Sequence, residues 1–329
     1  MILAGDIGGT KVNLASFEVK GQELHQGMIG SYPSRQHASL TEIVRLFLDT
    51  HSLKVEYASF GIAGPVKRGR SQLTNLPWVV DVRDLAKEVG LKYAWLINDL
   101  EANAYGIAAL KAQDFFALNP GEEGASGNAA IISAGTGLGE AGLFWDSHRH
   151  LPLACEGGHG DFAPRTDLDV ELFHHLRAQF GHVSWERVLS GPGSYNIYKF
   201  LRDTKRAEEP AWLTEELRQH DPPATISRLG LEGKCDICVQ TLNLFVTYYG
   251  VEAGNLALKI MSTAGLYVGG GIAPKIINKL KDGTFMSAFA NAGRMKPLLE
   301  AMPVRVILND KTALLGAARL AAAQAGWIR

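Results

Sequence analysis

Two short glycine-threonine stretches are the first residues of this sequence whose types and spacing suggest chemistry. GDIGGTK occupies residues 5–11 and SAGTGLG occupies residues 133–139, and each follows an apolar run typical of a β-strand. Glycines this close to a strand end let the backbone turn tightly or approach a ligand, because no side chain obstructs it. Both turns have the size expected of a phosphate-binding turn.

A third glycine cluster, LYVGGGIAP at residues 266–274, predicts a strand over 266–268 and a glycine turn over 269–271. Pro274 stands where a helix could begin. Each cluster taken alone is at least as consistent with an ordinary tight turn as with ligand binding. However, three glycine turns recur at strand ends. It is therefore much less probable that all three are ordinary tight turns.

Two other nucleotide-binding motifs fit poorly. No stretch has the Walker spacing of four residues between Gly and Gly-Lys-Ser/Thr. Gly137, Gly139 and Gly142 match the dinucleotide fingerprint, but an apolar stretch and a turn at 146–148 follow them where that fingerprint requires a helix. The sequence therefore favours a β-hairpin here and argues against a dinucleotide site.

Asp99 is a carboxylate at the predicted end of a strand, where it could contact a ligand. It ends the apolar run YAWLIND, and open α/β sheets bind ligands at the carboxyl ends of their strands. The alternative is that Asn98 and Asp99 simply cap a helix that begins near Leu100.

The elements that position these residues alternate between strands and helices. Strand patterns cover 2–7, 12–19, 58–64 and 93–99, and helical patterns cover 40–50, 82–89, 172–180, 235–260 and the C-terminal TALLGAARLAAAQAG. The strand-turn-strand pattern at 4–17 recurs at 129–145, which predicts two related α/β domains. The polar segment 119–127 is typical of a linker or surface loop, so we expect one smaller domain over 1–110 plus 311–329 and a larger one over 111–310.

Composition excludes several classes of protein. The 329 residues are 46% hydrophobic and carry a formal net charge of -1, so no sequence-wide basic field attracts nucleic acid or an anionic membrane. Residues 1–5 lack the features of a signal peptide, and no apolar run is long enough to span a bilayer. Three cysteines do not make a disulfide framework, and we expect a cytoplasmic protein.

The motifs resemble those of a known superfamily. GDIGGTK, SAGTGLG, LYVGGGIAP and the C-terminal TALLGAARLA resemble the phosphate, adenosine and connecting motifs of the actin-like ATPase (ribonuclease H-like) superfamily. INDLEANAYG, CEGGHGDFAP and SWERVLSGPGSYNIY are similar to the bacterial glucokinase family, and this resemblance covers nearly the whole chain. It implies two α/β domains around a central cleft that holds ATP and a sugar, and a homodimer.

The resemblance also implies site residues. The nucleotide ligands are Gly5, Asp6, Ile7, Gly8, Gly9, Thr10, Gly135, Thr136, Gly137, Gly269, Gly270 and Gly271. The sugar ligands are Asn75, Asn98, Asp99, Glu156, His159 and Glu186, with Asp99 as the catalytic base. Asp6 is expected to hold Mg²⁺ through water, since an unneutralised carboxylate beside phosphates is unfavourable. The alternatives are a turn-capping Asp6 and a structural His159.

Two departures from related patterns affect this expectation. Glu101 stands where relatives usually have threonine, and it would raise the pKa of the base if it pointed inward. Kinases of the ROK family carry a zinc held by clustered cysteines, whereas this chain has only Cys235 and Cys238 close together. Two buried thiols on one helix are therefore expected, without zinc.

The expected activity is phosphorylation of the 6-hydroxyl of D-glucose by Mg·ATP. A kinase for another hexose is the nearest alternative, and a non-catalytic sugar-binding regulator is the alternative from another class. A DNA-binding regulator would need a basic helix-turn-helix module, and we expect none in this chain.

Overall fold

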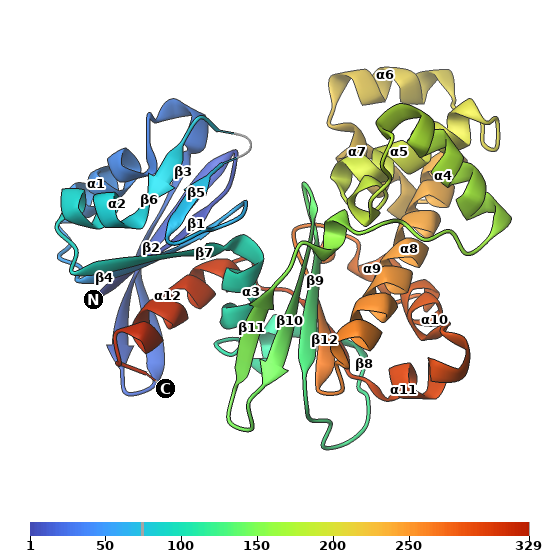
Figure 1. Cartoon of the computed structure of the whole chain (residues 1–329). Helices are drawn as coiled ribbons and strands as arrows, with labels where there is room; N and C mark the ends of the chain where they lie inside the picture. The colour runs from blue at the N-terminus through green and yellow to red at the C-terminus, as the bar shows by residue number, and fades with distance from the viewer. Residues whose placement is uncertain (74–75, 329) are drawn as a thin grey trace. The chain divides into compact units, whose positions relative to one another are not determined.

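Figure 1 shows the computed structural model of the chain, which describes residues 1–73 and 76–328. The chain divides into two compact units. The first comprises Met1–Asp114, Leu151–Ala154 and Asn309–Arg329, and the second comprises Phe115–His150 and Cys155–Leu308.

The first unit is built on a mixed sheet with the strand order β3-β2-β1-β4-β7. Its strands are β1 (Ile2–Ile7), β2 (Lys11–Lys20), β3 (Glu23–Pro33), β4 (Tyr57–Ile62) and β7 (Tyr93–Asn98), and β5 (Arg70–Gln72) pairs separately with β6 (Val79–Asp81). β1 pairs antiparallel with β2 and parallel with β4, which in turn pairs parallel with β7. The helices are α1 (Leu40–Thr50), α2 (Val82–Val89), α3 (Asp99–Ile107) and α12 (Thr312–Gln324), with short 3₁₀ turns at Ser34–Gln36 and Ala112–Asp114.

Alternation along β1 places apolar side chains on both faces of this sheet. Leu3 and Ile7 belong to a core with Phe47 of α1, whereas Ile2 and Ala4 belong to a core with residues of α12. Both faces of β1 are therefore covered, which holds the end of this strand firmly beneath the glycine turn.

The second unit is built on a sheet with the order β11-β10-β9-β12-β13-β8, of which residues Leu151–Ala154 of β11 are grouped with the first unit. Its strands are β8 (Phe115–Asn119), β9 (Ala129–Ala134), β10 (Leu138–Trp145), β11 (His150–Ala154), β12 (Gly265–Gly269) and β13 (Val304–Ile307). The helices are α4 (Asp167–Phe180), α5 (Gly191–Asp203), α6 (Ala211–Gln219), α7 (Pro222–Leu231), α8 (Asp236–Ile260), α9 (Ile277–Leu280), α10 (Thr284–Ala290) and α11 (Lys296–Ala301). Short 3₁₀ helices are η3 (Gly157–His159), η4 (Trp185–Arg187) and η5 (Gly293–Met295).

Helix α8 is the central helix of the second unit. It has 25 residues, packs against α5, α7 and α10, and extends from the group of α4–α7 toward α10 in Figure 1. Its side chains are buried around most of its circumference, as expected of a core helix.

The two sheets repeat one topology. In each, an antiparallel hairpin (β1-β2, β9-β10) continues into parallel neighbours (β4 and β7, β12 and β13). The predicted strand-turn-strand repeat and the α/β fold are confirmed.

Two local expectations need correction. Helix α9 begins at Ile277 instead of Pro274, because the chain after β12 makes turns in which the Lys275 and Ile276 N–H groups both donate to the Ile272 carbonyl. Helix α4 begins at Asp167, five residues earlier than its apolar pattern, because Thr166 and Asp169 form a reciprocal capping box.

The polar segment 119–127 is predicted from the sequence to be a linker or a surface loop. In the structure it comprises the last residue of β8 and part of the loop to β9, both in the second unit, so the loop alternative holds.

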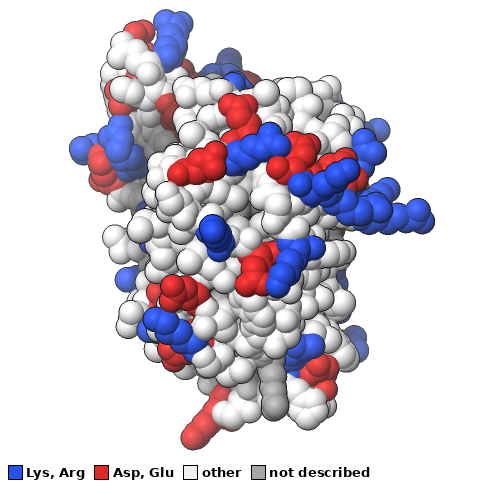
Figure 2. Space-filling view, turned by 90° about the vertical axis from the view of Figure 1, so that its left-hand side faces the viewer, with Lys and Arg blue, Asp and Glu red and all other residues white. Residues whose placement is uncertain are grey.

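Positive and negative side chains lie interspersed on the face shown in Figure 2, in keeping with the near-zero net charge. Across residues 1–73 and 76–328, no helix is long and apolar enough to cross a membrane.

Candidate active site

The first glycine turn joins β1 to β2. The Gly8 N–H donates to the Lys11 carbonyl at 3.0 Å, and Ser34 holds the turn from outside, donating from Oγ to the Gly8 carbonyl at 2.8 Å. Asp6 lies at the end of β1, where its Oδ2 accepts a long hydrogen bond of 3.4 Å from Asn13 Nδ2. Burial raises the pKa of the Asp6 carboxyl, and Asn13 and Lys11 only partly offset this effect. A cation would stabilise the ionised form of this carboxylate.

Asn98 and Asp99 lie where β7 passes into α3. Asn98 is the N-cap of α3: its Oδ1 accepts from the Leu100 N–H at 2.8 Å, and its Nδ2 donates to the Gly64 carbonyl at 3.3 Å. The Leu100 N–H also approaches Asp99 Oδ1 at 2.9 Å. The capping alternative is therefore confirmed for Asn98, and its contact with a sugar stays a prediction.

Asp6 and Asn98 lie at the same edge of the first sheet. Asp6 is level with Gly61 of β4, and Asn98 is level with the next residue of β4, Ile62. One strand separates β1 from β7, so the two backbones are roughly 10 Å apart. The structure thus brings the expected metal ligand and the expected base to one edge, whereas Asn75 lies outside the described residues.

Glu101 is turned toward its own helix. Burial raises the pKa of its carboxyl, and a hydrogen bond from the Asn98 backbone N–H lowers it. Since Asn98 is the N-cap and Glu101 the third helical residue, Glu101 acts as the second half of a capping box. This is a structural role that threonine at this position could not fill in the same way.

The second glycine turn joins β9 to β10 in the second unit. The Gly135 N–H donates to the Gly137 carbonyl at 2.8 Å, and the Gly191 N–H donates to the Gly135 carbonyl at 2.8 Å. The second bond attaches the N-terminus of α5 to the turn. Helix N-termini favour phosphate, because their free N–H groups and the helix dipole attract an anion.

Tyr249 of α8 connects this turn to the third glycine cluster. Its hydroxyl accepts from the Ala134 N–H at 3.1 Å and donates to the Gly269 carbonyl at 3.2 Å. Gly270 then adopts φ +82° and approaches the Ala134 backbone so closely that a Cβ would clash with the carbonyl oxygen. Only glycine fits here, where the residue that follows β12 comes close to the end of β9, its neighbour in the sheet.

A cavity of about 890 Å³ opens beside these turns, entirely within the second unit. Its wall includes Gly135, Thr136 and Gly271 from the glycine turns and Gly191 and Pro192 from the start of α5. The volume lies within the range of small-molecule sites, and apolar lining from α7 and α8 alternates with polar groups. Sequence reasoning did not single out Ser194 of the cavity, although it lies within SWERVLSGPGSYNIY. It also missed Asp221, Arg228, Phe245 and Lys275, which lie outside the quoted motifs.

The expected sugar ligands of the second unit converge around the start of β10. Glu156 is the N-cap of the 3₁₀ helix η3, and His159 is its last residue. The His159 N–H donates to the Glu156 carbonyl at 3.0 Å. Glu186, in η4, accepts from the Leu138 N–H through Oε2 at 3.0 Å. A bond of 2.9 Å from the Trp185 N–H to the Gly160 carbonyl joins the two turns.

The paired glycines of the EGGH motif have a packing explanation. A Cβ on Gly158 would clash with the Leu138 carbonyl oxygen, and one on Gly157 would clash with Glu140 Oε2. The turn that carries Glu156 and His159 therefore lies directly against the backbone and side chains of β10.

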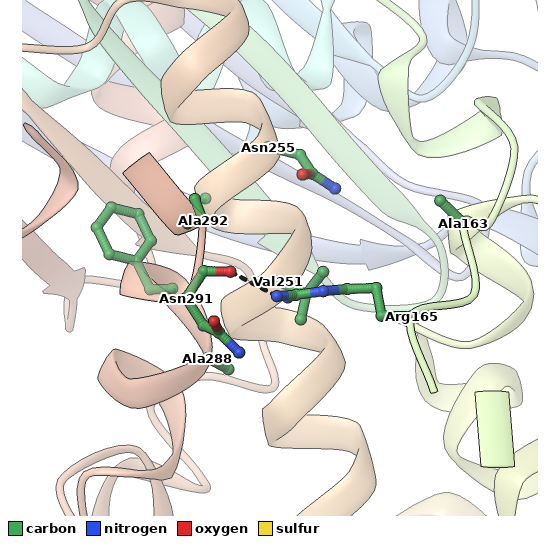
Figure 3. A pocket seen from close by; sticks show the side chains of 10 residues that line it. Ala163, Arg165, Val251, Asn255, Ala288, Asn291 and Ala292 are labelled. Atoms are coloured by element: carbon green, nitrogen blue, oxygen red, sulfur yellow. Dashed lines mark hydrogen bonds between the residues drawn. The ribbon is translucent and has the colours of Figure 1, made fainter. Parts of the chain in front are cut away.

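A second cavity lies apart from all these residues. It has a volume of about 420 Å³, and Figure 3 shows Arg165 reaching across it to donate to the Asn291 carbonyl. None of the residues that line it belongs to the predicted site.

Metal ligands are sparse. Residues 1–73 and 76–328 contain no group of three or more His, Cys, Asp or Glu side chains arranged to hold a metal ion. Cys235 and Cys238 are buried and unbridged, and Cys235 is the N-cap residue of α8. Asp6 stays the predicted ligand of a water-mediated Mg²⁺, an ion that usually takes one or two carboxylates plus phosphate oxygens.

Comparison with known proteins gives the family. A family model described as Glucokinase matches residues 3–324. The chain is 42% identical to a glucokinase of Trichormus variabilis, over 98% of this chain and 99% of that one. The chain belongs to the glucokinase family.

Solved structures agree with glucokinase membership. A crystal structure of a glucokinase from an Antarctic psychrotroph matches with a TM-score of 0.84 and 33% identity, covering 98% of each chain. A ROK family glucokinase from Streptomyces griseus, solved in complex with glucose and AMPPNP, matches with a TM-score of 0.68 and 20% identity over 98% of this chain and 99% of that one. The second likeness concerns the fold, which is that of the actin-like ATPases. The resemblance and fold class predicted from the sequence are confirmed, and the individual site residues of this glucokinase stay predictions.

Proposed function

We propose that this chain transfers the γ-phosphoryl group of ATP to the 6-hydroxyl of D-glucose, with Asp99 as the base that takes the hydroxyl proton. Membership of the glucokinase family assigns the chain the phosphorylation of glucose by ATP. The observation that carries the mechanism is the arrangement of glycine turns and carboxylates at the strand ends of both sheets.

ATP fits the 890 Å³ cavity of the second unit. The Gly269–Gly271 turn and the apolar wall from α8 suit the adenosine, and the Gly135–Gly137 turn with the N-terminus of α5 suits the phosphates. Lys275, in the same wall, offers a positive charge that the sequence motifs did not single out.

Asp6 and the Gly8–Thr10 turn would serve the phosphates from the first unit. Mg²⁺, when bound, neutralises charge on the phosphate oxygens and helps to orient the transferred group. The partly desolvated Asp6 carboxylate supports this role, because its pKa is raised by burial and a nearby cation would favour the ionised form.

The proposed glucose ligands offer acceptors and donors for vicinal hydroxyls. They are Glu156, His159, Glu186, Asn98 and Asp99. A carboxylate base contributes about 10²- to 10⁴-fold to the rate of such a reaction.

The test is ADP release with Mg·ATP across a panel of hexoses, for the wild type and Asp99→Asn. We expect turnover on glucose, lost about 10²- to 10⁴-fold in Asp99→Asn, while calorimetry still detects glucose binding. Asp84→Asn is the matched control, because Asp84 is also acidic and in the first turn of a helix of the first unit. Turnover on another hexose would change the substrate; binding without turnover would indicate a regulator. The homodimer and the cytoplasmic location stay predictions.

A further inference from the structure

Two glutamates are buried together behind the turn that carries Glu156 and His159. Glu140 of β10 is 2% exposed and Glu252 of α8 is 0% exposed. Their carboxyl groups lie within hydrogen-bonding range of each other. Two carboxylates cannot hydrogen bond without a proton between them, so one member of the pair is protonated.

The surroundings decide which member carries the proton. Glu252 accepts from Asn255 Nδ2 at 2.7 Å and lies 3.4 Å from Lys259 Nζ, so donors stabilise its negative charge. Glu140 Oε1 is buried, and within residues 1–73 and 76–328 no donor reaches it. The donors around Glu252 favour its negative charge, although burial raises the pKa of both carboxyls. Glu140 is therefore the member that donates the shared proton to Glu252. Asn255 also belongs to the wall of the cavity in Figure 3.

Glu140 is in direct contact with the EGGH turn. Its Oε2 occupies the space beside Gly157 that a Cβ would need. The Cys155 Sγ donates to the Glu140 backbone carbonyl at 3.2 Å, which attaches the residue before Glu156 to the same position of β10. The geometry of Glu156 and His159 thus depends on what lies at Glu140.

We propose that Glu140 is a positioning residue, which shares one proton with Glu252 and so holds the Gly157–His159 turn in the geometry that binds the sugar. The proposal rests on the proposed roles of Glu156 and His159 as sugar ligands. No step of phosphoryl transfer involves Glu140 itself.

Loss of the shared proton should disturb the turn. Burial and the charge of Glu252 raise the pKa of Glu140 to about 8, and Lys259 opposes the shift. Two further titratable groups interact with the charge of Glu140: Tyr249 of α8 and Cys155 of the adjoining loop. Above this pH two buried negative charges repel each other behind Gly157. If only the protonated form binds sugar, the competent fraction falls about tenfold between pH 7 and pH 9.

The experiment measures the dissociation constants of glucose and of AMPPNP by calorimetry at pH 7, 8 and 9, with steady-state kinetics alongside. In the wild type we expect the glucose Kd and KM to rise about tenfold from pH 7 to pH 9, with kcat and the AMPPNP Kd changed less than about twofold. Glu140→Gln keeps a neutral donor of the same shape, so its glucose Kd should stay near the wild-type value of pH 7 throughout. Glu300→Gln, an exposed change in the same unit, should behave as the wild type.

A second variant tests the pair itself. Glu252→Gln leaves Glu140 without a second buried charge to repel it, so its glucose Kd should not rise between pH 7 and pH 9. A wild-type Kd that does not change with pH, or a rise that persists in Glu140→Gln or in Glu252→Gln, would overturn the proposal. Binding is measured without turnover, so absent ADP release with normal binding would count against the proposed function alone, whereas a wild type that binds no glucose overturns both.

Discussion

The Leu138 N–H donates to Glu186 Oε2 at 3.0 Å, although the two residues are 48 positions apart in the sequence. Leu138 is the first residue of β10 and directly follows the Gly135–Gly137 turn, whereas Glu186 is a proposed sugar ligand. If Glu186 binds the sugar as proposed, one carboxylate supports the Gly135–Gly137 turn and also contacts the sugar. We therefore predict that this bond couples sugar binding to nucleotide binding within the second unit.

Substitutions at Glu186 should separate these two roles. Glu186→Gln keeps an oxygen that can accept from Leu138 but removes the charge that strengthens bonds to sugar hydroxyls. Because a charged hydrogen bond contributes about 1.5–3 kcal/mol, we expect the KM for glucose to rise about 10- to 100-fold with little change in the KM for ATP. Glu186→Ala leaves the Leu138 N–H without its acceptor, so the KM for ATP should rise as well. Steady-state kinetics with each substrate varied would detect the difference, and equal effects of both variants would contradict the coupling.

Gly158 should tolerate no side chain. In Gly158→Ala the methyl group meets the Leu138 carbonyl oxygen. The contact involves the backbone of η3 and the backbone of β10, and neither segment can move freely. Overpacking of this kind costs about 1–3 kcal/mol, so we expect a lower melting temperature and weakened glucose binding. Gly142→Ala, on β10, is the control. The atom nearest to the added Cβ is Cδ1 of Ile260, at 3.1 Å, and this side-chain end can move. A Gly158→Ala protein with wild-type glucose affinity would show that the turn can move without loss of binding.

Tyr249→Phe should affect the nucleotide. The change removes the acceptor of the Ala134 N–H and the donor to the Gly269 carbonyl, and both groups are buried. Leaving such groups unsatisfied costs about 1–3 kcal/mol of folding free energy, and the glycine turns they hold should loosen. We expect a higher KM for ATP with an unchanged KM for glucose. Tyr248→Phe is the control from the same helix, α8. It removes one hydrogen bond to Asp169 and should lower the stability without changing the KM for ATP.

Asp6 should govern the requirement for Mg²⁺. Asp6→Asn keeps the shape of the side chain but cannot attract the cation. Groups that hold a metal indirectly typically change its affinity 10- to 100-fold, so the Mg²⁺ concentration for half-maximal activity should rise by that factor. Titration of activity with Mg²⁺ at saturating ATP measures this, with glucose binding as the control. An unchanged Mg²⁺ requirement would favour the alternative in which Asp6 only caps the turn.

The stability of the protein should fall as pH rises through the range where Glu140 keeps its proton. In the unfolded chain this carboxyl ionises near its ordinary pKa of 4.5, whereas in the folded protein it ionises at about 8. Between these values the folded state holds more protons, so the free energy of unfolding decreases with pH, by at most about 1.4 kcal/mol per unit for one proton. Chemical denaturation from pH 4.5 to 8 should show a shallower decrease in Glu140→Gln than in the wild type. Equal slopes would show that Glu140 ionises normally in the folded state.

Local sequence determined the elements and their order. The helices over Leu40–Thr50 and Val82–Val89 have the predicted bounds, because each shows a clear apolar period between recognisable end signals. The recurrent strand-turn-strand pattern predicted the repeated sheet topology, since hairpins and strand alternation are local properties. The resemblance to glucokinases rested on motifs that tolerate little variation, and the family comparison confirmed it.

Only the tertiary structure decided how distant groups meet. No spacing indicates that Glu140 and Glu252 are in contact, because a strand and a helix separated by more than a hundred residues pack together through the whole core of the second unit. From the sequence alone, Glu140 is one residue of a strand that follows a glycine-rich turn. Glu252 is one polar residue in an apolar helix. The cavity beside α5, α7 and α8, the bond from Leu138 to Glu186 and the contact of Gly157 with Glu140 arise in the same way. Periodicity reports which face of an element is buried, whereas the partner against which that face packs is determined by the fold.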